Sequence, residues 1–555
     1  MRFVENLSAA MRDGVSLRGD LYQPDADDRR AVILMRTPYG KQGYRDDSLT
    51  RKAVERGFAV FVQDVRGRYA SDGEFDPYRQ DGRDGFDTIE WLATQPWSNG
   101  RIATAGLSYP GAVQWLAAVE TPPHLVCIFP AMCFSSGRQF FYFNGAWDMS
   151  WIPWTANNIA PDIRQRKKLV GPKTGAEARE AWSRSGRDAL RHVPLDTLPL
   201  LEGVADFYFE WLDHPDDGSF WDFADIESKH ERVRVPTFNF SGWHDEGYGP
   251  VGATRNFMGM RRRGGVSAQH HRLVIGPWTH GEPTVDSTKV GDRDFGAGAG
   301  LDYDALVLDW CDWHARGIER GIAATPRVRV FVMGANRWRN ASEWPLPDTT
   351  PRTLYLRAGG RLTSEPPAAA EAPDRYTFDP ADPVEDPHYE AGLGPHDQRG
   401  IERRSDVLTF TTGPLPEDVE IVGNVQIHLW IASSAPDTDF VARLIDVEPE
   451  GPAWNLMSPT LEVIRARYRT DEREPELMAP GRPYELVLRW GMTGNLFRKG
   501  HRIRLQVTSS FFPHLDRNPN TGRPVPHEGK LVAARQTVFH DAERPSRVIL
   551  PVIER

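Results

Sequence analysis

The segment from Thr104 to Gly111, with the sequence TAGLSYPG, constrains the fold of this chain more than any other. An apolar stretch at 102–105 precedes it and a longer one at 112–119 follows, which is typical of a strand, a tight turn and a helix. A serine at the apex, Ser108, would project its hydroxyl from a strained backbone, and a Cβ on either flanking glycine would collide with the neighbouring strand or helix. Glycine and serine also gather in ordinary turns, but the order of elements predicts a nucleophile elbow whose helix N-terminus faces a developing oxyanion.

Strand signals alternate with helical signals on both sides of this segment. The strands are expected at 15–22, 31–35, 58–65, 102–108, 125–130, 235–240 and 271–275. The helices are expected at 49–55, 84–92, 112–119 and 306–318. This alternation indicates a mainly parallel sheet with right-handed crossovers, because parallel strands need helical connections.

The pattern is interrupted at 135–231, where strand signals are few, aromatic residues and arginines are frequent, and 175–182 and 206–212 have helical patterning. A segment inserted between sheet strands lies over their carboxyl ends, where ligands bind in α/β folds. We therefore expect residues 135–231 to form a helical cap over a catalytic domain made of residues 1–134 and 232–343.

From residue 344 onward the helical signals nearly vanish and short strands with a period of two recur. These strands are expected at 353–356, 422–429, 440–444, 484–488 and 502–507, with a long loop at 359–375. This spacing is typical of an all-β sandwich of jelly-roll type. The predicted fold class is thus α/β: an α/β-hydrolase domain with an inserted helical cap and a C-terminal all-β jelly-roll domain at 344–555.

A nucleophilic serine needs a base, and the base needs an orienting carboxylate. In this fold the three follow in the order Ser, Asp, His, each just after a strand. Asp245 follows the strand at 235–240 and His280 follows the strand at 271–275, so both match in order and placement. We interpret Ser108, Asp245 and His280 as a candidate catalytic triad.

Other residues compete for two of these roles. His244 is a rival base, but it directly precedes Asp245, so the two side chains should diverge. Asp222 and Asp225 are rival acids, but they lie in the helical insertion and are better explained as a polar helix face.

The oxyanion hole should use the N–H of Tyr109 and one donor from the loop after an early strand, 36–41. Backbone N–H groups of this loop could serve, although Pro38 has none. Tyr39 offers its phenol, but it could equally be a packed aromatic residue.

Several motifs occur in a fixed order along the chain. They are Arg36-Thr37-Pro38-Tyr39, Gln63-Asp64-Val65-Arg66-Gly67-Arg68, Ser71-Asp72-Gly73-Glu74-Phe75, Gly106-Leu107-Ser108-Tyr109, Gly242-Trp243-His244-Asp245 and Gly276-Pro277-Trp278-Thr279-His280. This set resembles the serine hydrolase family that contains bacterial cocaine esterase, the X-prolyl dipeptidyl peptidases and the α-amino acid ester hydrolases. The likeness is greatest to the cocaine esterases. It continues at 327–334 and 512–522 and is weakest in the helical insertion.

The resemblance implies Ser108 as nucleophile, His280 as base, Asp245 as its orienting acid, and the Tyr39 hydroxyl with the Tyr109 N–H as oxyanion donors. It also implies a small-molecule ester or amide substrate, no cofactor and no metal, and a possible homodimer by analogy with the family.

Two departures from the family pattern affect the substrate pocket. The stretch from Tyr39 to Gly57 is several residues shorter than in cocaine esterase, and Gly247 stands where that esterase has an aromatic residue, so cocaine is not supported as a substrate. The aromatic lining must come from the cap, and the candidates are Phe141, Tyr142, Trp147, Trp151 and Trp154. The peptidases and amino-ester hydrolases need carboxylates for a substrate ammonium group, and Glu246 is the suggestive acid near the triad.

Composition excludes several other classes of protein. The 555 residues carry a net charge of −10 with no basic stripe, which argues against nucleic acid and anionic membranes as partners. The three cysteines form no CxxC or Cys/His pattern, so neither a disulfide framework nor zinc is expected. The N-terminus has no apolar signal segment and no apolar run could span a membrane, so we expect a cytoplasmic protein.

Three functions remain open. The first is a carboxylic ester hydrolase that works through an acyl-enzyme. The second keeps the triad but cleaves amides, as an acylase or aminopeptidase, and a paired-carboxylate ammonium site would distinguish it. The third is a non-enzymatic binding protein that uses the jelly roll, which an intact triad would leave unexplained.

Overall fold

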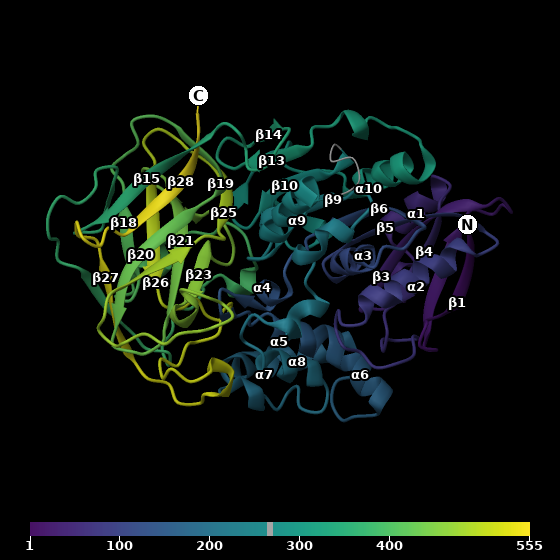
Figure 1. Cartoon of the computed structure of the whole chain (residues 1–555), viewed down its shortest axis with the longest axis horizontal. Helices are drawn as coiled ribbons and strands as arrows, with labels where there is room; N and C mark the ends of the chain where they lie inside the picture. The colour runs from purple at the N-terminus through teal and green to yellow at the C-terminus, as the bar shows by residue number, and fades with distance from the viewer. Residues whose placement is uncertain (264–269, 555) are drawn as a thin grey trace.

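The computed structural model describes residues 1–263 and 270–554. Figure 1 shows three parts: a large sheet covered by helices at the N-terminal side, a helical cap below it, and an all-β domain at the opposite end. This arrangement confirms the predicted fold class. Within the described residues, no helix combines the length and apolar character that crossing a membrane requires.

The large sheet has the strand order β1-β2-β4-β3-β5-β6-β9-β10-β13-β14. Pairing is parallel from β4 through β13 and antiparallel at both edges. The strands are β1 (Arg2–Ala10), β2 (Ser16–Gln23), β3 (Arg30–Thr37), β4 (Ala59–Asp64), β5 (Ser98–Leu107), β6 (Leu125–Ala131), β9 (Phe238–His244), β10 (Arg272–Thr279), β13 (Val328–Val332) and β14 (Arg337–Ala341). The helices of this part are α1 (Ser48–Glu55), α2 (Asp81–Ala93), α3 (Tyr109–Val119), α9 (Gly249–Arg263) and α10 (Tyr303–Cys311).

Strand β3 illustrates why the central strands are continuously apolar. Ile33 and Met35 pack in the core that includes α1 and α10, whereas Val32 and Leu34 pack in the core that includes α2 and α3. Because successive side chains point to opposite faces, every side chain of a strand covered on both sides is buried, and such a strand is apolar along its length.

The cap follows β6. Its elements are α4 (Gly137–Phe141), β7 (Tyr142–Phe143), β8 (Ala146–Trp147), α5 (Trp151–Trp154), a π-helical turn (Thr155–Ile159), α6 (Ala160–Lys167), α7 (Gly175–Arg191) and α8 (Asp206–Leu212). The short β7–β8 hairpin was not predicted. The predicted helix at 306–318 also differs: α10 ends at Cys311 and continues as a π-helical turn at Asp312–Arg316.

The C-terminal domain is a 14-stranded assembly. Its strands are β15 (Thr349–Arg357), β16 (Arg361–Thr363), β17 (Asp374–Phe378), β18 (Leu408–Thr411), β19 (Val419–Asn424), β20 (Gln426–Ser433), β21 (Asp439–Val447), β22 (Ala453–Asn455), β23 (Glu462–Arg465), β24 (Tyr484–Leu488), β25 (Met492–Phe497), β26 (Arg502–Thr508), β27 (Ala534–Phe539) and β28 (Arg547–Ile553). It is joined to the large sheet through Met333, which bonds the backbone of Gly494 and Leu496 at 2.9 and 2.8 Å.

Two predictions for this domain were wrong in detail. The strand expected at 422–429 is two strands, because Gly423 has φ 137° and the chain changes partners after Asn424. The loop expected at 359–375 contains β16, because Gly359 and Gly360, both with positive φ, close a tight hairpin after β15.

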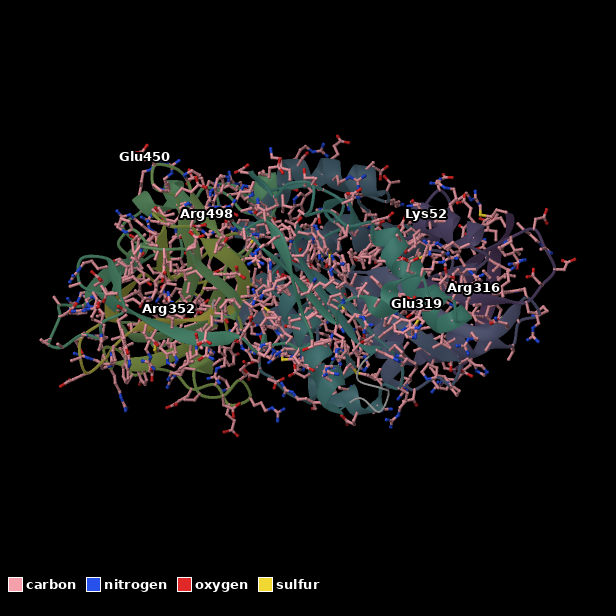
Figure 2. All side chains as sticks on the ribbon, turned by 90° about the horizontal axis from the view of Figure 1, so that it is seen from above. Lys52, Arg316, Glu319, Arg352, Glu450 and Arg498 are labelled. Carbon is pink, nitrogen blue, oxygen red and sulfur yellow. The ribbon has the colours of Figure 1, made fainter. Side chains whose placement is uncertain are left out.

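Charged side chains of both signs cover the outside of the two larger parts. Figure 2 labels Lys52, Arg316 and Glu319 at one end of the molecule and Arg352, Glu450 and Arg498 at the other. Many of these groups are paired; Lys52, for example, lies 2.7 Å from Asp304.

Candidate active site

Ser108 occupies the turn between β5 and α3 with φ 68° and ψ −127°, a conformation that non-glycine residues rarely adopt. Its N–H donates to the carbonyl of Ala131 at 3.0 Å. The glycines around it are required by close contacts. A Cβ on Gly106 would lie 2.5 Å from the Pro110 side chain, and one on Gly111 would lie 2.4 Å from the Ala131 carbonyl oxygen. The turn therefore holds the Ser108 hydroxyl out from the sheet edge.

His280 and Asp245 meet Ser108 from two neighbouring strands. His280 directly follows β10, and its Nε2 lies 2.8 Å from the Ser108 Oγ. Its Nδ1 lies 2.6 Å from Asp245 Oδ1, and Asp245, which directly follows β9, is completely buried. The other carboxylate oxygen of Asp245 accepts a hydrogen bond from Ser241 Oγ. The structure thus brings the three predicted residues into one hydrogen-bonded chain.

The carboxylates beside His280 outweigh the effect of its burial on its pKa. Burial lowers the pKa of His280, but the charge and hydrogen bond of Asp245, with a further contribution from Glu246, raise it to about 9. A carboxylate that stabilises the imidazolium in this way suits a group that accepts a proton during the reaction.

The rival residues lie elsewhere. His244 is buried, and its Nδ1 lies 3.0 Å from the hydroxyl of Ser458 in the C-terminal domain. Burial lowers its pKa to about 3, so it remains neutral. Asp222 is exposed in a 3₁₀ turn of the cap, and Asp225 accepts hydrogen bonds from the N–H and the hydroxyl of Ser228. None of the three contacts Ser108 or His280.

Two tyrosines flank the nucleophile as predicted oxyanion donors. Tyr109 is the first residue of α3, so its N–H has no acceptor within the helix. Tyr39 follows β3, and its side chain lines the same cavity as Ser108 and His280. Tyr39 as a whole is 36% exposed, but the loss of solvent around its phenol raises the pKa of that group, against the opposing effect of hydrogen bonds with Trp154 and Ser108. The phenol is therefore a neutral hydrogen-bond donor next to the Ser108 hydroxyl.

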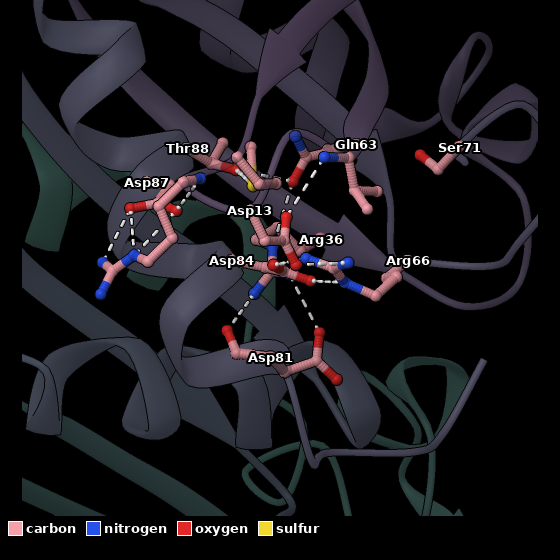
Figure 3. A network of polar contacts seen from close by, with 12 residues as sticks. Asp13, Arg36, Gln63, Arg66, Ser71, Asp81, Asp84, Asp87 and Thr88 are labelled. Atoms are coloured by element: carbon pink, nitrogen blue, oxygen red, sulfur yellow. Dashed lines mark hydrogen bonds and ion pairs between the residues drawn. The ribbon is translucent and has the colours of Figure 1, made fainter. Parts of the chain in front are cut away.

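The side chain of Tyr109 is fixed by a buried polar network, and Figure 3 shows the part of this network around Arg36, Gln63 and Asp81. Its hydroxyl donates to Asp81 Oδ2 at 2.6 Å and accepts from the N–H of Tyr78 at 3.1 Å. Arg36 binds the same Asp81 through its carbonyl at 2.7 Å and its Oδ1 at 3.0 Å, and also binds Gln63 at 3.1 Å. The start of α3, and with it the Tyr109 N–H, is anchored to α2 and to the sheet.

A cavity of about 390 Å³ opens in front of Ser108. Its aromatic lining consists of Tyr39, Tyr78, Phe140, Trp151, Trp154 and Tyr248. Trp151 and Trp154 were predicted. Tyr78, Phe140 and Tyr248 were not predicted. Tyr248 directly follows Gly247, which stands where cocaine esterase has an aromatic residue.

The other three predicted aromatic residues do not reach the cavity. Phe141, Tyr142 and Trp147 are fully buried and pack in the core of the cap. The Tyr142 hydroxyl donates to the carbonyl of Trp211 at 3.0 Å. These residues support the cap, and their assignment to the substrate pocket was wrong.

Two carboxylates share a wall near the triad. Glu246 lines the cavity in front of Ser108 and also a second cavity of about 440 Å³, to which Asp148 of the cap contributes. Asp148 accepts a hydrogen bond from the Ser150 N–H at 2.9 Å, while its Oδ2 is buried with no hydrogen-bond partner among the described residues. Burial and the neighbouring Glu246 raise the pKa of Asp148 to about 8. Asp148 was not predicted, because nothing in its sequence context distinguishes it from other acids of the cap.

Asp292, His388 and His396 form the group of described residues that comes nearest to a metal-binding arrangement, with ligand atoms within 4.8 Å of one another. The Nδ1 of His396 lies 2.9 Å from Asp292, and its Nε2 lies 2.9 Å from the carbonyl of Gly392. Because both ring nitrogens are engaged, we interpret this cluster as a polar contact between the two larger parts of the molecule.

The chain is similar to known proteins over nearly its full length. Residues 13–282 match the model of the X-Pro dipeptidyl-peptidase (S15 family), and residues 320–549 match the model of the X-Pro dipeptidyl-peptidase C-terminal non-catalytic domain. The chain is 34% identical to cocaine esterase from Rhodococcus sp., over 99% of this chain and 98% of that protein.

Two solved structures are similar along their full length. One is an aminopeptidase from a marine sediment Thaumarchaeota archaeon, with 25% identity, a TM-score of 0.84, and coverage of 100% of this chain and 97% of that one. The other is an α-amino acid ester hydrolase, with 26% identity, a TM-score of 0.83, and coverage of 99% and 96%.

Proposed function

Because the chain belongs to the X-Pro dipeptidyl-peptidase (S15) family, and is therefore an ester or amide hydrolase, we propose that it cleaves carboxylic esters through an acyl-enzyme formed on Ser108. The observation that carries this proposal is the continuous hydrogen-bonded chain from Ser108 Oγ through His280 to the buried Asp245, with distances of 2.8 and 2.6 Å. The 34% identity to an esterase over almost the full chain favours esters over amides.

In the proposed reaction, Ser108 Oγ attacks the ester carbonyl carbon while His280 Nε2 takes the hydroxyl proton. The carbonyl oxygen becomes an oxyanion that accepts hydrogen bonds from the Tyr39 hydroxyl and the Tyr109 N–H. His280 then gives its proton to the leaving alkoxide as the C–O bond breaks, which releases the alcohol and leaves the acyl group on Ser108. Water repeats the sequence, with His280 as base, and frees the acid.

The test is a panel of neutral esters and the matching anilides, assayed with the purified protein and with a fluorophosphonate probe. We expect turnover of esters, and phosphonylation of Ser108 detected by peptide mass spectrometry. Turnover of the anilides without the esters, or labelling at another serine, would contradict the proposal.

The Asp148–Glu246 pair favours a second candidate: hydrolysis of esters or amides whose acyl part carries an ammonium group. An ammonium group in the second cavity could interact with both carboxylates and would give Asp148 Oδ2 a hydrogen-bond partner. Since the pKa of Asp148 is about 8, its charged fraction rises as the pH rises from 6 to 8, so affinity should rise with it for a substrate whose ammonium group keeps its charge over this range.

An α-amino ester and its des-amino analogue distinguish the two candidates. If the ammonium group is recognised, Asp148→Asn lowers the ratio of their kcat/KM values about tenfold or more, because an amide cannot balance the cation. Equal ratios in both proteins would leave the neutral ester as the substrate class. Glu227→Gln, a change to a cap acid that pairs with Arg255 away from the cavity, serves as the control.

A further inference from the structure

Trp154 and Tyr39 meet at the edge of the active-site cavity, although 115 residues separate them in the chain. The Nε1 of Trp154 lies 3.0 Å from the Tyr39 hydroxyl oxygen. An indole N–H can only donate, so the Tyr39 oxygen must be the acceptor of this bond. The phenolic proton of Tyr39 then has to point away from Trp154, and among the described residues the second side chain hydrogen-bonded to this hydroxyl is Ser108.

The geometry points to Trp154 as a positioning residue: its indole N–H fixes the Tyr39 hydroxyl rotor so that the O–H faces the oxyanion formed at Ser108. This inference rests on the proposed function. A free phenol rotates its proton between two in-plane directions, and only one of them serves a developing negative charge. The Trp154 N–H occupies the other direction, so the Tyr39 O–H is already oriented before the reaction. The hydrogen bond that the Tyr39 oxygen accepts also strengthens the hydrogen bond that its O–H donates.

A buried arginine connects the loop that carries Tyr39 to the helical segment that carries Trp154. Arg68 is fully buried, and its Nε donates to the carbonyl of Pro38, the residue before Tyr39, at 2.8 Å. Its two terminal nitrogens donate to the carbonyls of Ile159 and Asn158 at 2.8 and 3.0 Å.

Those two carbonyls belong to the π-helical turn that directly follows Trp154. In a π-helical turn each N–H bonds to the i−5 carbonyl in place of the i−4 carbonyl, as the N–H of Ala160 does with Thr155. One guanidinium therefore ties the loop of the oxyanion donor to the helix that carries Trp154.

Trp151 provides a matched comparison within the same helical turn. It lines the same cavity and its ring packs edge-on against Trp154, with centroids 5.2 Å apart. Its Nε1, however, is buried with no hydrogen-bond partner among the described residues. Changing each tryptophan to phenylalanine removes similar ring area from the cavity, but only Trp154→Phe removes a hydrogen bond to the oxyanion donor.

The experiment is a double-mutant cycle with Trp154→Phe, Tyr39→Phe and the double variant, with Trp151→Phe as the comparison. We expect Trp154→Phe to lower kcat for a neutral ester about three- to tenfold with little change in KM, and to have less than a twofold further effect when Tyr39 is already phenylalanine. Trp151→Phe should act mainly on KM. Equal effects of Trp154→Phe in both backgrounds, or an unchanged kcat, would overturn the inference.

A second measurement needs no turnover. With 3-fluorotyrosine at position 39, fluorine NMR follows ionisation of that one phenol, and loss of the Trp154 donor should raise its pKa because the N–H stabilises the phenolate. An unchanged pKa in Trp154→Phe, with Trp151→Phe as reference, would contradict the inference even if the substrate class were wrong. Failure of the proposed function would show differently, as ester turnover that survives Ser108→Ala.

Discussion

Ser108, Asp245 and His280 stand at the carboxyl ends of β5, β9 and β10, whereas the wall opposite them comes from the cap and from loops beside it. The first group rests on the parallel part of one sheet, where only β6 separates β5 from β9 and β10, and close contacts at the glycines beside Ser108 fix the elbow. The second group is assembled from segments far apart in the chain, joined by side chains such as Arg68. We infer that the sheet side carries the triad, whereas the cap side shapes the substrate cavity and, through Trp154, positions one oxyanion donor.

The strongest test of this division is Ser108→Ala. The sheet side supplies the nucleophile, and Ser108 is the described serine of the cavity that is hydrogen-bonded to His280. The kcat for esters should therefore fall about 10⁴-fold or more, while the unfolding temperature stays close to that of the wild type. The measurement is steady-state hydrolysis at saturating ester, with the fluorophosphonate probe as a check on labelling. Substantial turnover in the folded variant would remove Ser108 from the mechanism.

Asp245→Asn should cost almost as much, about 10³- to 10⁴-fold in kcat, because an amide neither stabilises the His280 imidazolium nor fixes its tautomer. His244→Ala should leave kcat within a few fold, since His244 contacts Ser458 and not the triad. It should lower stability instead, because it empties a buried position. If the two variants gave the reverse order, the choice of base-orienting residue would be wrong.

Tyr39→Phe tests the point where the two sides meet. It keeps the ring but removes the hydroxyl, so kcat should fall about 10²- to 10³-fold with little change in KM, as expected for a bond made mainly in the transition state. The kinetic constants of a neutral ester measure this directly. An unchanged kcat would mean that Tyr39 only packs against Trp154 and that a backbone N–H does the work.

The same division explains what could be predicted from the sequence. The elbow and the two residues after β9 and β10 were placed correctly because each is a local motif at the end of a strand, and parallel strands bring their carboxyl ends to one edge. The sheet, the cap and the all-β domain followed from hydrophobic periodicity, which the dense cores require.

The cavity wall could not be predicted in the same way. In α4, Phe140 lines the cavity while its neighbour Phe141 is buried in the core, since successive helical residues point about 100° apart. The sequence shows that aromatic residues are abundant in the cap but not how the cap is turned. Likewise, Asp148 and Glu246 come together only through the folding of the cap onto the sheet.

The pH dependence of kcat/KM sharpens the role of the sheet side. His280 must be neutral to accept a proton, and its pKa is raised to about 9, so the active fraction falls as the pH drops below that value. For a neutral ester, kcat/KM should rise with pH by roughly tenfold per unit between pH 7 and 8 and level off near pH 9. In Asp245→Asn the inflection should move to lower pH, because burial then acts on His280 without an opposing carboxylate.

Tyr109→Phe should have a small effect on kcat, because it changes the support of the oxyanion N–H but not the N–H itself. The substitution leaves the buried Asp81 oxygen and the Tyr78 N–H without the phenol that satisfies both, so the free energy of unfolding should fall by about 1–3 kcal/mol.

The start of α3 would also be held less firmly, and we expect kcat to fall by a few fold with KM nearly unchanged. Tyr376→Phe is the matched control, because it removes a buried hydroxyl bonded at 2.8 Å to Ser509 in the C-terminal domain. It should lose stability without losing kcat. A Tyr109 variant that loses stability alone would show that β5 and the elbow hold the N–H in place without help from the Asp81 network.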